Sequence, residues 1–161
     1  TVVGNEHNKY HYQKPAPDFL IGLNTRLNYK QFDFSFSSRL SIGNYVYNNV
    51  QSVRAFYNGL YTLQHFRNVP NAIRDTNFVN QQIYSDYYIE NASFFKLDNV
   101  GLGYSINSIA AGKLKARVSL TVQNAFVITK YSGIDPEVVG GIDNNIYPRP
   151  RTYLLGFNLT F

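Results

Sequence analysis

Hydrophobic and polar residues alternate over the last eleven residues of the chain, 151–161. Every second side chain there is apolar: Tyr153, Leu155, Phe157, Leu159 and Phe161. A period of two predicts a β-strand with one apolar face, and roughly ten residues is the length that a tilted strand needs to cross a bilayer. Since a terminus in water usually frays, apolar side chains up to the last residue indicate a strand that faces lipid and closes a barrel.

Four further segments share this alternation. Residues 18–29 and 32–43 predict a hairpin of two long strands, joined by a tight turn at Lys30 and Gln31. Residues 93–106 and 113–124 predict the third and fourth strands, so that 151–161 is the fifth. Within 93–106 the apolar positions change parity at Asp98 and Asn99, which a β-bulge would cause.

Two long connections, about 44–92 and 125–150, separate these strands. Residues at helical spacing predict a short amphipathic helix in the first of them: Val50, Val53, Phe56, Tyr57, Leu60 and Gln64. Short and long connections alternate along the chain, which is typical of transmembrane barrels with short periplasmic turns and long extracellular loops. We therefore expect both long connections to be extracellular.

The polar faces of the strands distinguish a membrane barrel from a soluble β-sandwich. A sandwich would carry many Lys and Glu on its water-facing side, whereas these strands carry amides, hydroxyls and a few arginines, which suit a wet lumen. A charge on the apolar face would cost roughly 2–4 kcal/mol at the bilayer midplane, and those faces carry none. The residues that we expect to face the lumen are Asn24, Arg26, Asn28, Arg39, Arg117, Ser119, Thr121 and Gln123.

Composition supports the membrane interpretation. Charged residues make up 16% of the 161 residues, below the roughly 25% of soluble domains, and aromatic residues are frequent because there are 14 Tyr and 12 Phe. No run of apolar residues is long enough for a transmembrane helix, and the chain has no Cys. The net charge of +5 is scattered and indicates only a weak preference for anionic surroundings.

These observations predict an all-β fold, an antiparallel transmembrane β-barrel segment with long extracellular loops. Five strands are too few for a closed barrel, since the smallest single-chain barrels have about eight and open sheet edges do not occur in lipid. We therefore expect the last strands of a larger barrel. The alternative is a soluble β-sandwich that binds carbohydrate through its aromatic loops.

Four motifs, in order along the chain, resemble the SusC/RagA family of TonB-dependent outer-membrane transporters. They are residues 88–104 (YIENASFFKLDNVGLGY), 123–131 (QNAFVITKY), 133–137 (GIDPE) and 147–153 (YPRPRTY), followed by the terminal Phe161. Residues 18–50 resemble the family more loosely, and the connection between them resembles nothing specific.

The resemblance implies a 22-stranded barrel, of which residues 1–161 would be the C-terminal portion, in the outer membrane of a Gram-negative bacterium. It also implies several partners: the remainder of the barrel and a plug, the TonB system, a SusD-like lipoprotein as lid, outer-membrane lipid, and a glycan or peptide substrate that is imported. The C-terminal residues Tyr153, Phe157, Leu159 and Phe161 resemble the signal read by the barrel-assembly machinery.

The tyrosines of the long first connection have two interpretations. They could stack on substrate or contact the lid, or they could pack the connection onto itself, which we favour for most of them. The candidates for substrate or lid contact are Tyr45, Tyr47, Tyr57, Tyr61, Tyr84 and Tyr87.

The sequence offers no catalytic or metal-binding constellation. Asp135 and Glu137 flank Pro136 and are better explained by turn formation than by catalysis. His7 and His11 are four residues apart, but no third ligand is near and no helical pattern supports a metal site. We expect no enzyme activity, no cofactor and no nucleic-acid partner.

Overall fold

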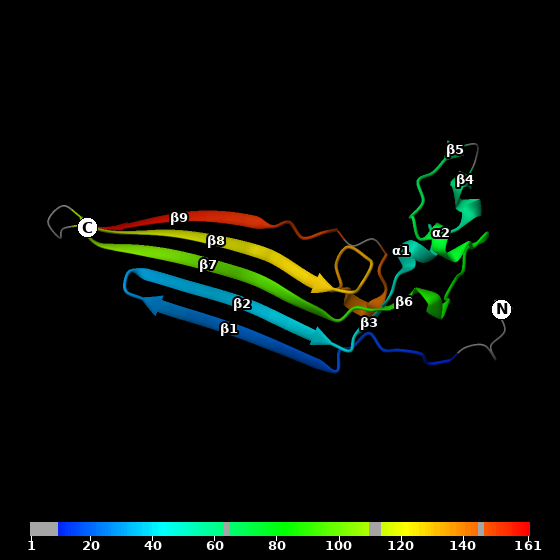
Figure 1. Ribbon diagram of the computed structural model, residues 1–161, viewed down its shortest axis with the longest axis horizontal. Coiled ribbons are helices and arrows are strands. Elements are labelled where there is room, and N and C mark those ends of the chain that lie inside the picture. The colour runs from blue at the N-terminus through cyan, green and yellow to red at the C-terminus, as the bar shows by residue number, and fades with distance from the viewer. Residues whose placement is uncertain (1–9, 63–64, 110–113, 145–146) are drawn as a thin grey trace. The chain divides into compact units, whose positions relative to one another are not determined.

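A computed structural model of the protein describes residues 10–62, 65–109, 114–144 and 147–161. The chain forms two compact units (Figure 1). One unit, the loop unit, contains 1–17, 43–93 and 130–147, and the other, the sheet unit, contains 18–42, 94–129 and 148–161. Each unit is therefore built from segments that are distant in sequence.

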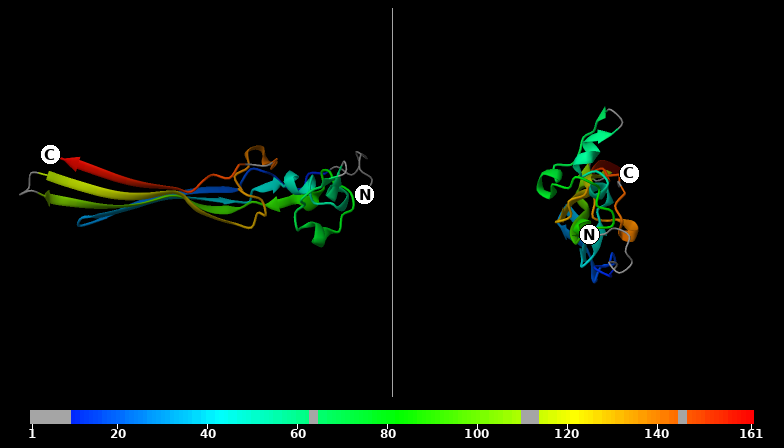
Figure 2. Two further views of the ribbon diagram at one scale, coloured as in Figure 1. Left: turned by 90° about the horizontal axis from the view of Figure 1, so that it is seen from above. Right: turned by 90° about the vertical axis from the view of Figure 1, so that its right-hand side faces the viewer.

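The sheet unit is one antiparallel sheet of five strands in the order β1-β2-β7-β8-β9. Figure 2 shows these strands as a single twisted layer. A period-two sequence with one apolar face produces such a layer because alternate side chains point to opposite faces. The strands are β1 (Phe19–Tyr29), β2 (Phe32–Ile42), β7 (Phe94–Ile109), β8 (Leu114–Thr129) and β9 (Thr152–Thr160).

The five predicted strands are all present, and the turn at Lys30 and Gln31 joins β1 to β2. The expected end of the fourth strand is wrong, because β8 continues past Gln123 to Thr129. Asn124 has a left-handed φ of 50°, and beyond it Phe126 pairs with Leu97. The register shift beside Asp98 confirms the bulge in β7, and the two irregularities together let pairing continue.

The register places most apolar residues of the five strands on one face. Leu120 of β8 pairs with Leu102 of β7 and with Leu155 of β9 in one apolar row across the sheet. These side chains are exposed: Leu120 is 46%, Phe157 69% and Leu159 65% accessible. A two-sheet sandwich would bury this face, so the exposure argues against the alternative fold.

The loop unit has a small core of its own. β3 (Tyr45–Tyr47) pairs with β6 (Ile89–Asn91), and the buried Val46, Ala92 and Tyr131 pack together. The other elements are short: α1 (Asn49–Ser52), η2 (Tyr57–Leu60), β4 (Tyr61–Thr62), β5 (His65–Phe66), α2 (Ile73–Thr76), η3 (Asp86–Tyr88) and η4 (Val139–Gly141).

The expected amphipathic helix is wrong in extent. The α-helix α1 ends at Ser52, and the separate 3-10 turn η2 begins at Tyr57. The buried residues of this segment are Ser52 and Ala55, whereas Val53 of the predicted apolar stripe is 42% exposed. The two long connections are also not simple loops, since they fold together into one unit. Among the described residues, no helix combines the length and apolar character needed to cross a membrane.

Candidate functional site

The polar face of the sheet gathers the eight residues that the sequence predicted for a lumen. Asn24 pairs with Ser37 and Arg26 with Ser35 across β1 and β2, and Ser119 and Thr121 of β8 pair with Gly103 and Gly101 of β7. Residues directly opposite each other in a sheet share a face. The register therefore places all eight opposite the apolar rows: Asn24, Arg26, Asn28, Arg39, Arg117, Ser119, Thr121 and Gln123.

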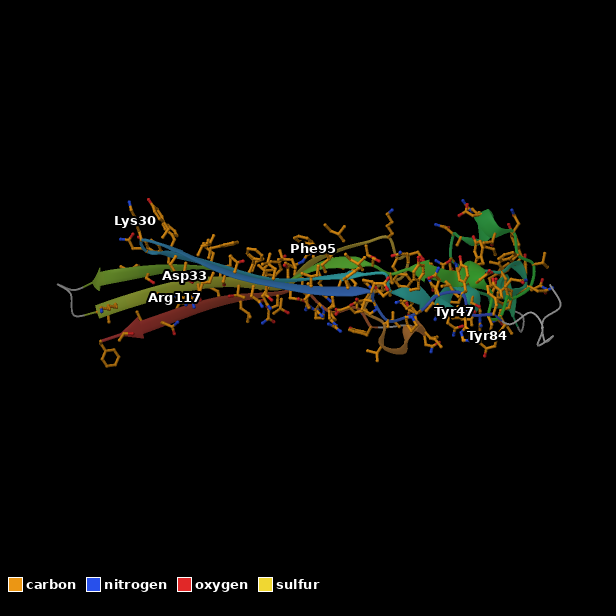
Figure 3. The ribbon with its side chains drawn as sticks, turned by 90° about the horizontal axis from the view of Figure 1, so that it is seen from below. Lys30, Asp33, Tyr47, Tyr84, Phe95 and Arg117 are labelled. Carbon is orange, nitrogen blue, oxygen red and sulfur yellow. The ribbon has the colours of Figure 1, made fainter. Side chains whose placement is uncertain are left out.

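An ion pair crosses this face near the β1–β2 turn (Figure 3). The Arg117 guanidinium donates from Nε to Asp33 Oδ1 at 3.1 Å and from Nη2 to Asp33 Oδ2 at 2.7 Å. Arg26 approaches the same carboxylate at 4.0 Å. The bridge passes over Gly103, where an added Cβ would lie 2.3 Å from Asp33 Oδ1. A residue without a side chain is therefore required beneath it.

A second ion pair lies at the β-bulge. Arg39 donates from Nε to Asp98 Oδ2 at 2.7 Å and from Nη2 to Asp98 Oδ1 at 2.9 Å. Asp98 is the residue that the register skips between Leu97 and Asn99. The bulge thus turns a carboxylate onto the polar face where regular pairing would have pointed it to the apolar side.

The sequence-based set of site residues omitted Asp33 and Asp98. The signal for Asp33 was present, since it has the same parity in β2 as Arg39. Asp98 could have been predicted only by combining the bulge with the pairing of β2 and β7. The local sequence pattern does not contain that pairing. The role of Gly103 could likewise not be predicted without the strand pairing, because it depends on Asp33 and Arg117 from the two neighbouring strands.

The predicted tyrosines of the loop unit divide into packed and exposed residues. The Tyr47 hydroxyl donates to Ser52 Oγ at 2.8 Å and accepts from the Tyr84 backbone N at 3.0 Å. Tyr45 lies half-buried in β3, and Tyr87 packs edge-on against Tyr88 but is still 55% accessible. By contrast, side chains at the surface could meet a ligand or partner: Tyr57 is 38%, Tyr61 70% and Tyr84 88% accessible.

A polar cluster joins three segments of the loop unit. The buried Asn48 side chain donates to Glu90 Oε1 at 2.9 Å and to Ser132 Oγ at 3.1 Å. Ser132 donates to Glu90 through its backbone N and its hydroxyl, and Gln51 Nε2 donates to Ser132 Oγ. Local sequence pattern gave no signal for these contacts, which span 42 residues or more in the chain.

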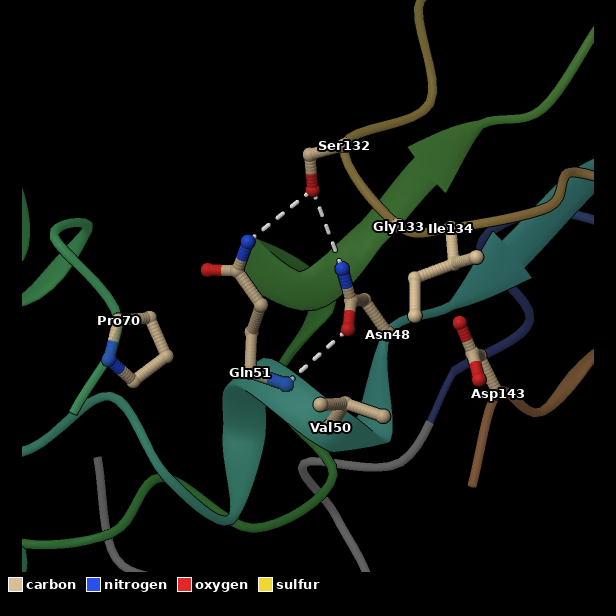
Figure 4. Close-up of a pocket in the computed structure, with 8 residues that line it drawn as sticks. All are labelled: Asn48, Val50, Gln51, Pro70, Ser132, Gly133, Ile134 and Asp143. Atoms are coloured by element: carbon tan, nitrogen blue, oxygen red, sulfur yellow. Dashed lines mark hydrogen bonds between the residues drawn. The ribbon is translucent and has the colours of Figure 1, made fainter. Parts of the chain in front are cut away.

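A small pocket of about 160 Å³ adjoins this cluster (Figure 4). The Gln51 side-chain oxygen points away from Ser132, on the side of Pro70. The pocket has room for one side chain or one ring. Its lining is Asn48, Val50, Gln51, Pro70, Ser132, Gly133, Ile134 and Asp143.

Tyr131 is a buried titratable group of the loop unit. Its hydroxyl donates to Asp143 Oδ2 at 2.7 Å. Burial, followed by the hydrogen bond and the charge of Asp143, raises the pKa of Tyr131 well above its ordinary value. Burial also raises the pKa of Tyr88, whose hydroxyl has no hydrogen-bond partner within the part of the chain that the structure describes. Both groups are structural in this setting.

The remaining candidates have simple outcomes. The Glu137 backbone N donates to Asp135 Oδ1 at 2.9 Å, which confirms turn formation around Pro136. His7 lies outside the described residues, and His11 is exposed. Among the described residues, no group of three or more His, Asp or Glu is arranged to hold a metal ion.

The four residues of the predicted assembly signal lie on the apolar face or at its end. Tyr153, Phe157 and Leu159 of β9 share the face of Val122, Val118 and Ala116 of β8. Phe161 follows the end of β9 and is fully exposed. Their role in assembly stays a prediction.

The chain is similar in sequence to TonB-dependent receptors. It is 46% identical over 160 residues to "TonB-dependent receptor SusC" of Bacteroides thetaiotaomicron, a match that covers 95% of this chain and 16% of the relative. It is 30% identical over 172 residues to "TonB-dependent receptor P26" of Formosa agariphila, covering 91% of this chain and 17% of that protein. The chain thus spans about one sixth of the length of the curated relatives it matches. No protein-family model matches it.

Solved structures with a similar fold belong to peptide importers. The RagAB peptide importer in its "open-open" state matches with a TM-score of 0.71 and 25% identity, over 92% of this chain and 18% of that one. The RagAB peptide transporter matches with a TM-score of 0.73 at 25% identity and the same coverage.

Proposed function

This chain is related in sequence and in fold to TonB-dependent receptors of the SusC/RagA type, and we propose that it is a section of the outer-membrane barrel of such a receptor. The proposed activity is the TonB-driven import of a glycan or peptide nutrient into a Gram-negative bacterium. The relatives are receptors and importers rather than enzymes, and we assign no catalytic step to this chain. The plug and the contact with TonB would belong to the remainder of the receptor.

The observation that carries this proposal is the division of the sheet into two faces. The apolar face has no charged residue in any of its five strands and exposes residues such as Leu155 and Phe157 at 63% and 69%. In water such a surface would be unfavourable, since monomeric soluble proteins rarely expose contiguous apolar patches larger than a few hundred Å². In a bilayer it would meet acyl chains, while the polar face would meet the aqueous lumen.

The loop unit would be extracellular and would contact the substrate or a SusD-like lipoprotein lid. The exposed Tyr61 and Tyr84 support this assignment because aromatic side chains of this kind suit binding surfaces. Tyr61 also packs against Phe66 across the β4–β5 hairpin, with ring centroids 5.0 Å apart. Such a pair presents a preformed aromatic surface.

The proposal can be tested with two adjacent positions of β8. The chain contains no Cys, so Leu120→Cys and Thr121→Cys can each carry a single bimane label in a full-length receptor that lacks other reactive cysteines. The labelled receptors are reconstituted into vesicles that contain nitroxide-labelled lipid. We expect strong quenching of the label at position 120 and little quenching at position 121, because successive residues of a strand face opposite sides.

Equal quenching at both positions would contradict the proposal. Protection of the label at position 120 from both nitroxide lipid and aqueous iodide would mean that the apolar face is covered by protein, as in a sandwich. Leu102→Cys and Gly101→Cys in β7 provide an independent pair, because Leu102 pairs with Leu120 and Gly101 with Thr121.

A further inference from the structure

The charged residues of the five long strands all lie on the polar face. There are seven of them, five cations and two carboxylates, which gives this face a net charge of +3. The register puts Arg39 opposite Lys96 and Lys115 opposite Thr160, in line with the other polar rows. The set consists of Arg26, Asp33, Arg39, Lys96, Asp98, Lys115 and Arg117.

Both carboxylates are already engaged by arginines of the sheet. Asp33 accepts two hydrogen bonds from Arg117, and Asp98 accepts two from Arg39. A bidentate pair fixes each carboxylate against one guanidinium and offsets the charge of that arginine. The five cations of this face therefore exceed its two carboxylates by three.

The surplus positive charge is accessible at the end of the sheet near the β1–β2 turn. Arg26 lies 4.0 Å from Asp33, with 67% of its side chain accessible. Lys115 is exposed two residues before Arg117 in β8. The Asp33–Arg117 ion pair lies over Gly103, and Ser35 Oγ lies over Gly101. An anionic group would therefore reach the exposed side chains of Arg26 and Lys115 rather than the backbone of β7.

A second concentration of positive charge lies at the bulge. Arg39 and Lys96 stand directly opposite each other in the register, and like charges in that position repel. Arg39, Lys96 and Arg149 all act electrostatically on the Asp98 carboxylate. Lys96 is only 4% accessible, so the inference rests on the exposed cations Arg26 and Lys115.

We propose that this section of the wall binds the anionic groups of the imported substrate, carboxylates above all. The inference rests on the proposed function, because it requires the polar face to line the lumen. A cleft with one sign of charge and low-dielectric walls raises the local concentration of opposite charge. The wall then favours acidic substrates over neutral or basic ones of the same size, and Arg26 and Lys115 set that preference.

The experiment uses cells that express the full-length receptor and a matched strain without functional TonB. Both are supplied with a mixture of oligogalacturonates, neutral malto-oligosaccharides of the same length, and hexapeptides with net charges of −2, 0 and +2. Mass spectrometry measures the depletion of each probe from the medium. The test variant is Arg26→Gln with Lys115→Gln, and the charge-matched control is Lys30→Gln with Lys130→Gln, which removes two positive charges outside the strands.

We expect TonB-dependent depletion of an acidic glycan or an acidic peptide to exceed that of its neutral counterpart at least about threefold, within the range of electrostatic steering. The ratio should fall about two- to fivefold in the test variant, remain unchanged in the control, and fall further with glutamate at both positions. Raised ionic strength should reduce it as well.

Three results would overturn the inference. Preferential depletion of neutral or basic probes by the unmodified receptor would contradict the substrate class. If the test variant loses thermal stability but keeps the depletion ratio, Arg26 and Lys115 bind an acidic protein segment inside the barrel instead of the substrate. No depletion above the TonB-deficient strain, for any probe, would instead refute the proposed import function on which the inference rests.

Discussion

At the scale of single residues, Tyr131 is held in place by two independent contacts. Its ring is 5% accessible and packs in the loop-unit core with Val46 and Ala92. Its hydroxyl is bound by Asp143, and its ring leaves no space for a side chain at position 133. An added Cβ at Gly133 would lie 2.3 Å from Tyr131 Cε1. The small residue and the buried ring therefore depend on each other.

Gly133→Ala should destabilise the loop unit by about 1–3 kcal/mol, the usual cost of forcing extra volume into a packed site. Hydrogen–deuterium exchange of the full-length receptor measures this as faster exchange of amides near Val46 and Ala92. Gly22→Ala is the control, because an added Cβ there meets nothing within 4 Å. Equal effects of the two substitutions would contradict the steric explanation.

Tyr131→Phe should cost about 1–3 kcal/mol of local stability, because Asp143 loses a hydrogen bond in a buried site. The same exchange experiment measures it, and Tyr84→Phe is the control because Tyr84 is 88% accessible. An equal loss in both variants would assign the effect to something other than the Asp143 contact.

The tyrosine also predicts a pH dependence. Burial and Asp143 raise the pKa of Tyr131 in the folded state, so its stabilising contribution is complete below the unfolded value of about 10 and is lost as the pH rises above it. The contribution of Tyr131 to the protection of the core amides, corrected for intrinsic exchange, should be constant from pH 6 to 9 and fall above pH 10. Tyr131→Phe should lack that part of the fall.

At the scale of elements, β7 and β8 are paired along 16-residue strands that each contain an irregularity. Asp98 bulges from β7, and Asn124 adopts a left-handed conformation in β8. Asn tolerates this conformation better than most residues. Its side chain also donates to the Pro150 carbonyl at 3.1 Å, which ties the bulge to the segment that leads into β9.

Asn124→Ala should therefore lower stability by about 1–2 kcal/mol, since a residue with a Cβ and no polar group is strained at positive φ. Asn124→Gly removes the hydrogen bond but permits the backbone conformation, and should cost less. Urea unfolding of the full-length receptor in vesicles compares the two variants. Equal costs would show that the Pro150 contact, rather than the backbone, stabilises the bulge.

The elements that could be predicted from sequence were those with a local pattern. Period-two alternation identified both faces of β1, β2 and β9, and the change of parity revealed the bulge at Asp98. The continuation of β8 could not be predicted, because Asn124 and Ala125 interrupt the alternation and only pairing with β7 resumes it. A local pattern contains no information on which distant strand supplies a partner.

The same limit explains the loop unit. β3 and β6 pair across some 40 residues of chain, and Glu90 binds Ser132 from another segment. No periodicity spans these distances, so the connections were predicted as loops. The polar face could be predicted, because odd and even positions of a strand point to opposite faces and so separate lumen-type from lipid-type residues. Its ion pairs were not, since each joins residues from different strands.

At the scale of the whole molecule, the sheet unit has an exposed apolar face and, within the described residues, two outer edges: β1 pairs only with β2, and β9 only with β8. Unpaired edges and contiguous apolar surface both promote association. The isolated 161-residue chain should therefore form oligomers or aggregates in buffer without detergent, as measured by sedimentation. A folded, monodisperse monomer would contradict the membrane assignment and favour a soluble module.

Assembly of the complete receptor should depend on the aromatic side chain of Phe161. Phe161 follows β9, is fully exposed and extends the apolar row of Phe157 and Leu159. Since its side chain contributes little to packing within the chain, Phe161→Ala should leave the stability of the folded receptor nearly unchanged but reduce the amount of folded receptor in the outer membrane several-fold. Heat-modifiability on gels of membrane fractions measures that amount, and Tyr147→Ala, another exposed aromatic residue at 87% accessibility, is the control. If both variants assemble equally well, Phe161 serves the lipid contact of the barrel wall and is not an assembly signal.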